Sequence, residues 1–497
     1  MSKSKSMSKG EMKEFTPHPY QARGIREIIE QKSVALWWDP GLGKTVTTLS
    51  AIKELWLDYW QISHVLIIAP LKVAESTWQS ELTEWQHLSE LFAVYEREDT
   101  SASADQRGGP GEFWEKMETI CTTLIGDAKT RKKRYEDSKR TLITVINRDN
   151  VKWLVDHVWS EDHGRWPYDM IVIDEATSFK NHASQRFKAL RRVRGQIKRV
   201  VELTGTPASN GLMDLWAQLY LLDGGERLLR TITAYRSRYF SFNEYTHVYR
   251  PLAGSEGMIL GRVGDICHSL EAKDYLDLPD YVEEDVPVNL TDKQLSVYKQ
   301  FERDSVLELI DTDEKLISGS AAVLTNKLLQ FSSGAVYDEE KRIHDLHDEK
   351  LRVFAEIMGS TAEPVLVFYK FRFDLERIEQ ELKKQKKRYR VYKTDDDLRA
   401  WNDGELDVLV ASPESCGYGL NLQKGGRRIL WYTVTWSHEV YKQANARLYR
   451  QGQMKPVIVQ RLITRHTVDE RVRQVLDGKA TTHDLVMNYV KEYKNVK

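Results

Sequence analysis

Short apolar runs rich in β-branched residues recur along the chain, and each is followed by a polar loop and a helix-compatible stretch. In the first half of the chain, these runs lie at 33–38, 64–70, 141–147, 169–176 and 198–207. A second series lies at 364–370, 388–394, 406–412, 427–433 and 456–463. Strands that alternate with helices build parallel sheets whose faces are covered by the helices. The sequence therefore predicts an α/β protein with two parallel-sheet domains.

The region between the two series has a different pattern. Residues 221–345 lose the short apolar runs and gain long charged stretches, such as 291–310, in which the apolar positions fall near one helical face: Leu295, Tyr298, Phe301, Val306 and Leu309. We therefore expect the following organisation: a disordered tail at 1–14, a first lobe at 15–220 with an exposed insertion near 96–112, a mainly helical region at 221–345, a second lobe at 346–475 and a C-terminal extension at 476–497.

Composition limits the kind of protein this chain can be. Its 497 residues carry 73 Lys+Arg against 74 Asp+Glu, a net charge of -1, so any site for a polyanion must be a local patch. The three cysteines are far apart and form no CxxC pair, which supports neither a disulfide framework nor a structural zinc site. We see no apolar run long enough for a membrane span and no secretory signal. We expect a cytoplasmic protein.

The segment DPGLGKT at 39–45 has the context of a phosphate-binding loop. It follows the apolar run 33–38 directly and precedes a helix-compatible run. Gly41 and Gly43 would let backbone N–H groups approach phosphate oxygens, Lys44 would reach the β- and γ-phosphates, and Thr45 would ligate Mg²⁺. Trp38 occupies the position of the first glycine of the GxxxxGK[ST] pattern. Taken alone, the segment could also be an ordinary glycine turn between strand and helix.

Two adjacent acids end another apolar run in the same half of the chain. Asp174 and Glu175 follow the residues IVI at 171–173, which places them at the carboxyl edge of the predicted sheet. In phosphoryl transfer, one such acid holds Mg²⁺ while the other orients or deprotonates the attacking water. Acids after strands are also common helix N-caps, so the pair alone is a weak signal. Together with the glycine-rich loop, it predicts a site that hydrolyses ATP.

With these two motifs, the chain resembles superfamily 2 helicase-type ATPases, and among them the Swi/Snf-like translocases of double-stranded DNA. The resemblance spans about 15–475 and rests on eight blocks in the family's order. These are HPYQ (18–21), DPGLGKT (39–45), IIAPLKVAESTWQSEL (67–82), DEATSFKN (174–181), LTGTPASN (203–210), VLVFYKFR (365–372), ASPESCGYGLNLQ (411–423) and QANARLYRQGQ (443–453). In its small size, the chain resembles the compact family members that phage and prophage genomes encode. This resemblance implies a protein that acts in the host cytoplasm.

The resemblance implies two RecA-like lobes, with ATP in the cleft between them and DNA across both. In the first lobe it implies that Gln21 reads the adenine and that Thr204 and Thr206 couple hydrolysis to lobe movement. For the second lobe it implies that Gly419 senses the γ-phosphate and DNA, that Gln443 contacts ATP, and that Arg447 and Arg450 neutralise charge on the transferred phosphoryl group, with Arg450 as the arginine finger.

Several positions depart from the family's pattern. Ala446 replaces the usual Asp or Gly, Tyr449 replaces a frequent His, and the residues at 435–437 are Thr-Trp-Ser rather than Asp-Trp-Asn. The acidic block also ends in Thr177. We expect these changes to affect coupling more than the reaction itself.

Local clusters of positive charge offer places for DNA. Seven basic residues and no acid lie between 181 and 199, and a second run of seven lies at 383–393 with Tyr389 and Tyr392 interleaved. Phosphate contacts of this kind give salt-sensitive binding without sequence preference. The alternative is that each run is a solvated face. From the first run we select four candidate DNA-binding residues: Arg186, Lys188, Arg191 and Arg192.

The expected function is that of an ATPase motor, stimulated by DNA and dependent on Mg²⁺, that moves along double-stranded or branched DNA and remodels it or its complexes. One alternative is a helicase that separates strands or migrates branches, because the motifs are shared. A subunit coupled to a nuclease is disfavoured, because no nuclease signature lies outside the motor motifs. A DNA-binding scaffold without catalysis is disfavoured by the intact GKT, DEAT and paired arginines.

Overall fold

The computed structural model describes residues 12–92, 120–208, 211–244, 248–276, 278–311, 317–416 and 420–477, without the side chains of 248 and 307–322. The expected insertion at 96–112 and nearly all of the expected terminal segments lie outside these ranges. The chain forms two compact units, Met1–Leu276 and Asp277–Lys497. No helix in the described ranges is long and apolar enough to cross a membrane.

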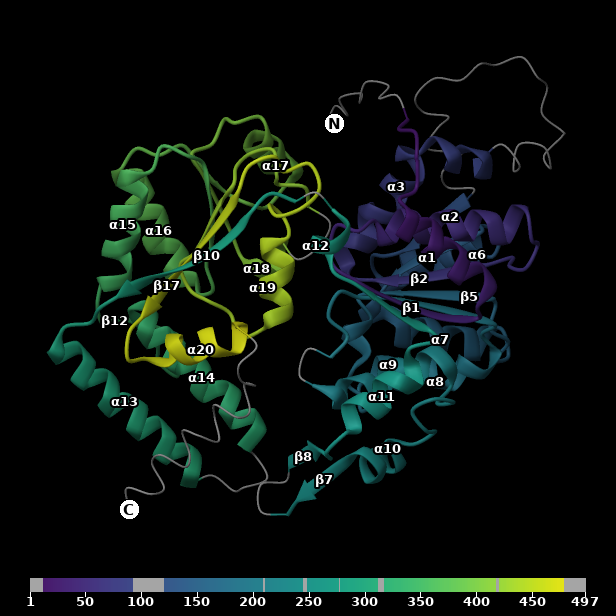
Figure 1. The fold of residues 1–497 in the computed structure, drawn as a ribbon, viewed down its shortest axis with the longest axis horizontal. Helices are drawn as coiled ribbons and strands as arrows, with labels where there is room; N and C mark the ends of the chain where they lie inside the picture. The colour runs from purple at the N-terminus through teal and green to yellow at the C-terminus, as the bar shows by residue number, and fades with distance from the viewer. Residues whose placement is uncertain are drawn as a thin grey trace. The chain divides into compact units, whose positions relative to one another are not determined.

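The first unit is built on a seven-stranded parallel sheet with the order β3-β4-β2-β5-β6-β1-β9 (Figure 1). Its strands are β1 (Ser33–Trp38), β2 (Val65–Ala69), β3 (Cys121–Leu124), β4 (Ile143–Asn147), β5 (Met170–Asp174), β6 (Arg199–Leu203) and β9 (Cys267–Leu270). Its helices are α1 (Pro19–Glu30), α2 (Lys44–Leu57), α3 (Trp78–Glu84), α6 (Ala128–Ser138), α7 (Val151–Glu161), α8 (Gln185–Val193), α9 (Leu215–Asp223), α10 (Ile232–Tyr239), α11 (Ser255–Val263) and α12 (Ala272–Tyr275). A separate antiparallel hairpin joins β7 (Phe240–Asn243) to β8 (Val248–Pro251).

Helices cover both faces of this sheet. In Figure 1, α1 and α2 lie on one face, while α7, α8 and α9 lie on the other. The second face carries a continuous apolar core that includes Trp37, Ile173, Leu190 and Trp216. Because the side chains of a strand alternate between faces, one strand can supply residues to both layers. This explains why the strands read as nearly continuous apolar runs in the sequence.

The second unit is built on a six-stranded parallel sheet with the order β10-β17-β16-β13-β15-β14. Its strands are β10 (Tyr281–Val288), β13 (Val365–Phe368), β14 (Tyr389–Val391), β15 (Val408–Ala411), β16 (Arg428–Trp431) and β17 (Val457–Thr464), and a small hairpin joins β11 (Ala335–Tyr337) to β12 (Ile343–Asp345). Its helices are α13 (Asp292–Asp311), α14 (Ile317–Ser333), α15 (Glu349–Ser360), α16 (Arg372–Lys384), α17 (Asp395–Asn402), α18 (Pro413–Cys416), α19 (His438–Asn445) and α20 (Val468–Leu476).

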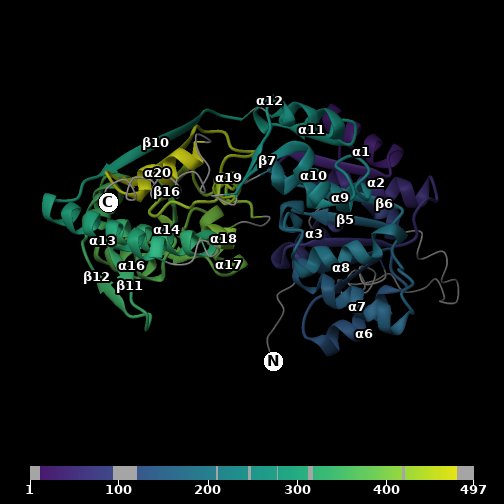
Figure 2. The same ribbon diagram turned by 90° about the horizontal axis from the view of Figure 1, so that it is seen from below.

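The two parallel sheets with flanking helices confirm the predicted fold class. The region 221–345, expected as one helical block, divides between the units at Leu276. Its strand β9 joins the first sheet, its strand β10 joins the second sheet, and its longest helices, α13 and α14, run beside each other in the second unit (Figure 2). Tyr298 and Val306 of α13 are fully buried, as the helical pattern predicted.

Candidate nucleotide site

The glycine-rich loop joins β1 to α2 at the carboxyl edge of the first sheet. Gly41 and Gly43 both adopt left-handed backbone angles, with φ of 91° and 74°. A side chain at Gly43 would also lie 2.4 Å from the amide nitrogen of Gln21. Glycine is therefore required here for the backbone conformation and for the close contact with α1. The loop has the curvature expected of a phosphate cradle at a helix N-terminus.

Trp38 occupies the position of the missing first glycine, and the structure shows how it is accommodated. Its side chain is 1% exposed and lies edge-on to Tyr20, with ring centroids 5.5 Å apart. A side chain at Gly24 would lie 2.6 Å from the far edge of the Trp38 indole. The indole therefore packs on the backbone of α1, and its bulk is directed into the interior of the first unit.

Lys44 and Asp174 meet at the carboxyl edge of the sheet. The Lys44 ammonium donates to the backbone carbonyls of Trp38 at 2.7 Å and Asp39 at 3.3 Å. Asp174 accepts a hydrogen bond of 3.1 Å from the indole nitrogen of Trp78. Burial raises the pKa of Asp174, and the positive charge of Lys44 and the bond from Trp78 oppose that rise. The Lys44 ammonium could donate to a phosphate, and the Asp174 carboxylate could bind a divalent cation.

Glu175 has a strained backbone. Its φ of 53° and ψ of 62° lie in the left-handed region, which non-glycine residues rarely adopt. Such strain costs about 1–3 kcal/mol and is concentrated at functional sites, where the surrounding structure maintains it. The turn places Glu175 directly after β5 and before the short helix Ala176–Phe179. The strain supports a functional role for this acid.

Gln21 contacts the glycine-rich loop directly. Its carbonyl oxygen accepts from the backbone N–H of His18 at 2.9 Å, and its amide donates to the carbonyl of Leu42 at 3.2 Å. The predicted adenine-reading residue therefore also connects the start of α1 to the loop. The sequence pattern located Gln21, but only the structure shows this second contact.

The turn after β6 packs against the same loop. The hydroxyl of Thr204 accepts from the backbone N–H of Thr206 at 3.2 Å, and Thr204 is fully buried. A side chain at Gly205 would lie 3.2 Å from the Pro40 ring and 3.3 Å from the Trp38 carbonyl. The predicted coupling turn and the phosphate loop are therefore in close backbone contact.

A cavity of about 380 Å³ opens beside α1 at the ends of β1 and β9. Three aromatic side chains, Tyr20, Trp38 and Tyr275, line it together with Glu27 and His268. Burial lowers the pKa of His268, and the Glu27 carboxylate opposes this shift. The sequence analysis missed Tyr275 and His268, because they follow the first strand series by more than 60 residues and belong to no recognised block.

The other predicted nucleotide residues lie in the second unit. The amide of Gln443 donates to Glu439 at 3.4 Å on α19. Arg447 is 7% exposed, and Arg450 donates to the carbonyl of Leu420 at 3.1 Å. Gly419 lies outside the described residues. The two arginines therefore follow α19 directly, within the loop that precedes β17.

The first basic run is largely occupied by contacts within its own unit. Arg194 is directed inward, where it donates to the carbonyls of Leu221 and Leu222, and Arg199 donates to those of Ile28 and Gln31. The four candidate DNA-binding residues lie on α8, and three of them have partners. Arg186 pairs with Asp149 at 3.2 Å, Arg191 lies over the Tyr220 ring, and Arg192 pairs with Asp156 at 2.7 Å, whereas Lys188 is exposed.

The second basic run is partly structural as well. Tyr392 is 8% exposed and belongs to the apolar core of the second unit, so it is not available to stack on a base. Arg388 pairs with Asp407 at 2.7 Å. The sequence analysis missed another basic segment, α6, which carries five basic residues between 129 and 134. The run KTRKKR was a visible signal there.

The residues at the loop fit a magnesium–nucleotide complex. No cluster of three or more His, Cys, Asp or Glu side chains that could hold a metal ion occurs in the described ranges. Mg²⁺ in nucleotide sites needs no such cluster, because it takes most of its ligands from phosphate and water. Thr45 and the half-buried carboxylate of Asp174 would provide the two oxygen ligands that such a site takes from the protein.

Comparisons with known proteins identify the family of this chain. The profile of the SNF2-related domain matches residues 20–333. Protein p41 of Acyrthosiphon pisum secondary endosymbiont phage 1 is 32% identical over 496 residues, which cover 97% of this chain and 100% of p41. The CHD3-type chromatin-remodeling factor PICKLE of Arabidopsis thaliana is 24% identical, over 95% of this chain and 34% of its own length.

The uncharacterized ATP-dependent helicase MG018 of Mycoplasma genitalium is 24% identical, over 93% of this chain and 41% of its own length. This chain thus spans the whole phage protein but less than half of the two cellular relatives. Among solved structures, the Sulfolobus solfataricus SWI2/SNF2 ATPase core in complex with dsDNA aligns with a TM-score of 0.42 at 21% identity, over 94% of this chain and 91% of that one. On the match of the family profile and the phage relative, the chain belongs to the SNF2-related family of ATP hydrolases.

Proposed function

We propose that this protein is a DNA-stimulated ATPase that couples ATP hydrolysis to translocation on double-stranded DNA. The observation that carries the proposal is the arrangement at the edge of the first sheet. Lys44 and Asp174 lie there, both half-buried, and the turn at 204–206 packs on the backbone of the phosphate loop. A loop that binds phosphate and packs against a second turn can convert phosphate release into backbone movement.

Each residue has a distinct role in this proposal. Lys44 exchanges its two carbonyl acceptors for the β- and γ-phosphates, and Glu175 orients the attacking water. Mg²⁺, held by Thr45 and Asp174, would neutralise charge on the phosphate oxygens. Arg447 and Arg450 stabilise the transferred phosphoryl group, and Arg450 is the arginine finger. Gln21 reads the adenine, and Gln443 and Gly419 contribute to nucleotide binding.

DNA is the proposed track because the family includes ATP-dependent helicases and chromatin-remodeling factors. On the first unit, the exposed side chain of Lys188 and the ion-paired Arg186 and Arg192 offer positive charge for phosphates. Surface ion pairs contribute about 0–1 kcal/mol, so these arginines can exchange their acidic partners for DNA phosphates at little cost. Binding of this kind is independent of sequence.

Steady-state ATP hydrolysis tests the proposal. Turnover is measured with Mg²⁺ alone and then with single-stranded DNA, duplex DNA, branched DNA and RNA. We expect duplex or branched DNA to raise turnover, and Lys44→Ala or Glu175→Gln to lower it by about 100-fold or more. Lys53→Ala, on the same helix as Lys44, is the matched control and should retain turnover.

Movement needs a separate measurement. Displacement of a third strand from a triplex reports translocation on duplex DNA, whereas release of one strand of a duplex reports strand separation. Triplex displacement without duplex unwinding supports translocation. Duplex unwinding would favour the helicase alternative, and a turnover that no nucleic acid changes would contradict both.

A further inference from the structure

The segment 71–84 is a part of the first unit that has no role in the proposed function. It follows β2, lies largely within the family block at 67–82 and ends with α3. A π-helix, Val73–Thr77, precedes α3 directly, and the residues 71–72 before it are helical as well. A π-turn adds one residue to a helix, which rotates the residues after it by about 100° relative to a continuous α-helix. The direction of Trp78, the first residue of α3, therefore depends on this turn.

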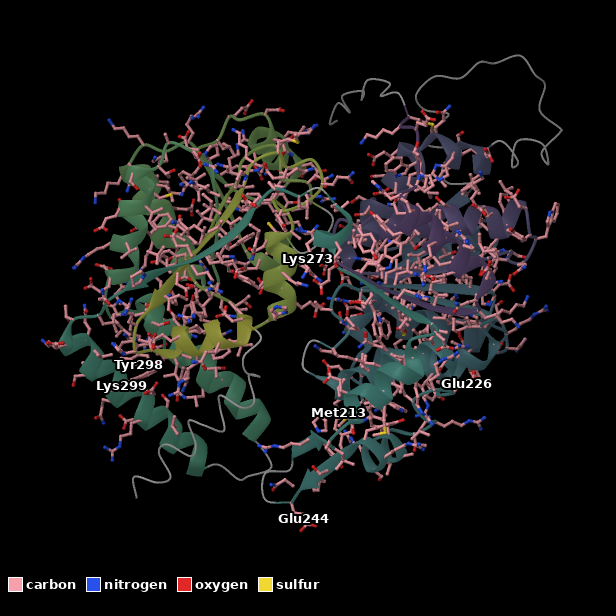
Figure 3. The ribbon with its side chains drawn as sticks, in the orientation of Figure 1. Met213, Glu226, Glu244, Lys273, Tyr298 and Lys299 are labelled. Atoms are coloured by element: carbon pink, nitrogen blue, oxygen red, sulfur yellow. The ribbon has the colours of Figure 1, made fainter. Side chains whose placement is uncertain are left out.

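The Trp78 side chain is buried against the nucleotide site. Side chains fill the space between the first sheet and the helices that cover it (Figure 3), and the Trp78 indole belongs to this interior, with 1% of its surface exposed. The π-helix contacts β2 and β4, and α3 packs on α2, the helix that begins at Lys44. The indole nitrogen of Trp78 donates to Oδ2 of Asp174 at 3.1 Å. One side chain thus links the acid at the end of β5 to the layer that carries the phosphate-binding helix.

Other buried tryptophans show that this bond is not the usual way to satisfy an indole in this chain. Trp216 and Trp401 donate to neutral backbone carbonyls, at 3.0 Å and 2.8 Å. The indole nitrogen of Trp38, in the same unit as Trp78, is buried with no hydrogen-bond partner in the described ranges. Because this interior holds an indole without any acceptor, the need for a hydrogen bond does not by itself explain why Trp78 meets a carboxylate.

We propose that Trp78 is a positioning residue of the nucleotide site, whose indole N–H fixes the orientation of the Asp174 carboxylate for binding a divalent cation. The proposal rests on the proposed function, since it takes Asp174 as a ligand of Mg²⁺. Within the described ranges, no other side chain donates a hydrogen bond to this carboxylate. A carboxylate that is bonded at one oxygen does not rotate freely, so its other oxygen keeps a fixed direction. Hydrogen bonds to metal ligands set ligand orientation in this way, and their loss typically costs about 10- to 100-fold in metal affinity or activity.

This arrangement predicts a specific defect. The bond touches the acid and not the phosphate loop, so its loss should weaken metal binding and leave the binding of metal-free nucleotide unchanged. A general loss of packing between α2 and α3 would instead weaken both, because α2 begins at the phosphate-binding Lys44. The two kinds of binding therefore separate a positioning role from a merely structural one.

Binding of Mn²⁺ to the complex of the full chain with ADP, followed by electron paramagnetic resonance, tests the proposal without turnover. Mn²⁺ is the probe because it binds the same carboxylate and phosphate oxygens as Mg²⁺ and is paramagnetic. We expect Trp78→Phe to weaken Mn²⁺ binding about tenfold, and to raise by a similar factor the Mg²⁺ concentration that gives half-maximal ATP turnover. The affinity for ADP without metal should not change. In an Asp174→Asn chain, Trp78→Phe should have no further effect on Mn²⁺ binding, because the carboxylate is then absent.

Trp85→Phe is the matched control. Trp85 follows α3 and donates to Glu81 at 2.6 Å, so this change removes an indole–carboxylate bond of the same segment that does not reach Asp174. It should leave Mn²⁺ binding and the Mg²⁺ requirement unchanged. Wild-type Mn²⁺ affinity in Trp78→Phe overturns the proposal, as does an equal loss in Trp85→Phe or in the binding of metal-free ADP. A further loss in the Asp174→Asn chain overturns it as well.

A second variant separates the hydrogen bond from the volume of the ring. Benzothienylalanine at position 78 keeps the size of the indole and replaces its N–H with sulphur, so it should weaken Mn²⁺ binding as Trp78→Phe does. If Trp78→Phe unfolds, this variant decides, and wild-type Mn²⁺ affinity in it overturns the proposal. Failure of the proposed function is distinct, since it would show as a wild-type chain that hydrolyses no ATP with Mg²⁺, whatever the effect of these variants on Mn²⁺ binding.

Discussion

In the second unit, Asp469 is fully buried and both of its carboxylate oxygens accept hydrogen bonds, whereas in the first unit Glu202 is fully buried with no hydrogen-bond partner in the described ranges. Asp469 accepts from Lys350 at 2.7 Å, from Ser332 at 2.8 Å and from the backbone N–H of Thr464 at 3.0 Å. These bonds join α14, α15 and α20 to the end of β17. The same kind of sheet therefore accompanies a buried acid with several hydrogen-bond donors in one unit and, within the described ranges, a buried acid with none in the other.

Glu202 lies on β6 opposite Ala35 of β1 and Ile173 of β5, so its carboxyl group is directed into the apolar face of the first sheet. The positive charge of the nearby Arg194 lowers the pKa of Glu202, which opposes the effect of burial. The guanidinium of Arg194, however, donates to backbone carbonyls and not to the Glu202 carboxyl group. Burial raises the pKa of Glu202 well above its ordinary value. The comparison indicates that a buried acid with three donors can join helices to a sheet, as Asp469 does, whereas a buried acid without donors, such as Glu202, is accommodated by a raised pKa.

Breaking the network of the second unit should give the largest effect. Asp469→Ala leaves the Lys350 ammonium buried without its acceptor, so we expect a loss of about 3–5 kcal/mol in the free energy of unfolding of this unit. Urea unfolding, with hydrogen exchange of peptides from α14 and α20, measures this loss. Lys350→Met combined with Asp469→Leu is the control, and it should recover part of the loss. An Asp469→Ala chain as stable as wild type would contradict the assignment.

At the nucleotide site, by contrast, removal of a carboxylate should not lower the free energy of unfolding. Asp174→Asn removes a buried carboxylate whose pKa is raised by burial, so we expect unchanged or slightly higher stability. ATP turnover should fall about 100-fold, because Asn is a poor Mg²⁺ ligand in place of a carboxylate. Thermal unfolding and turnover are measured on the same preparation. A parallel loss of both would show that Asp174 is structural.

The unsatisfied acid predicts a stability that depends on pH. The folded pKa of Glu202 is raised, so the unfolded chain releases this proton first, and stability falls as pH rises from the unfolded value of about 4.5 toward the folded one. Glu202→Gln removes the ionisable carboxyl group and with it this loss of stability. We expect the variant to be about 1–2 kcal/mol more stable than wild type near pH 8 and nearly as stable as wild type near pH 5. Denaturation at both pH values measures the difference. An equal effect at both would refute ionisation as its cause.

The buried histidines should give a smaller dependence of stability on pH, in which stability falls as the pH falls. Burial lowers the pKa of His347 in the second unit and of His87 in the first to about 4. A lowered folded pKa means that the unfolded chain binds the proton first as pH falls, so stability declines from about pH 6.5 toward 4. His347→Gln should reduce this decline, by on the order of 1 kcal/mol between pH 7 and 5, only for the second unit. Unit-specific hydrogen exchange checks this, and an equal change in both units would contradict it.

Much of the fold could be predicted from sequence pattern. The run 33–38 coincides with β1, and the other apolar runs contain or overlap β2, β4, β5, β6 and β13 to β17, because strands buried on both faces read as continuous apolar segments. The pattern missed β3, and it missed β9 and β10, which lie in the region expected to be helical. β10 has the sequence YVEEDVPV, and its residues 282–284 and 287 are exposed. Its pairing with β17, and not its hydrophobicity, therefore makes it a strand.

The nucleotide site also has a part that could be predicted from the sequence and a part that could not. A phosphate loop and an acidic strand end are local features, so the sequence identified Gly41, Gly43, Lys44, Asp174 and Glu175. Trp78, which donates to Asp174 across 96 positions, has no local signal. The basic runs show the limit most clearly: charge spacing could not reveal that Arg194 and Arg199 bind backbone carbonyls inside the first unit.

The sequence by itself determined the α/β class, the two sheets, the family and the phosphate loop, because each depends on residues that are close together in the chain or on a periodic pattern. Only the tertiary structure decided which charged side chains are available to solvent and which buried acids have partners. Burial and pairing depend on contacts between residues far apart in the chain, and such contacts leave no local pattern.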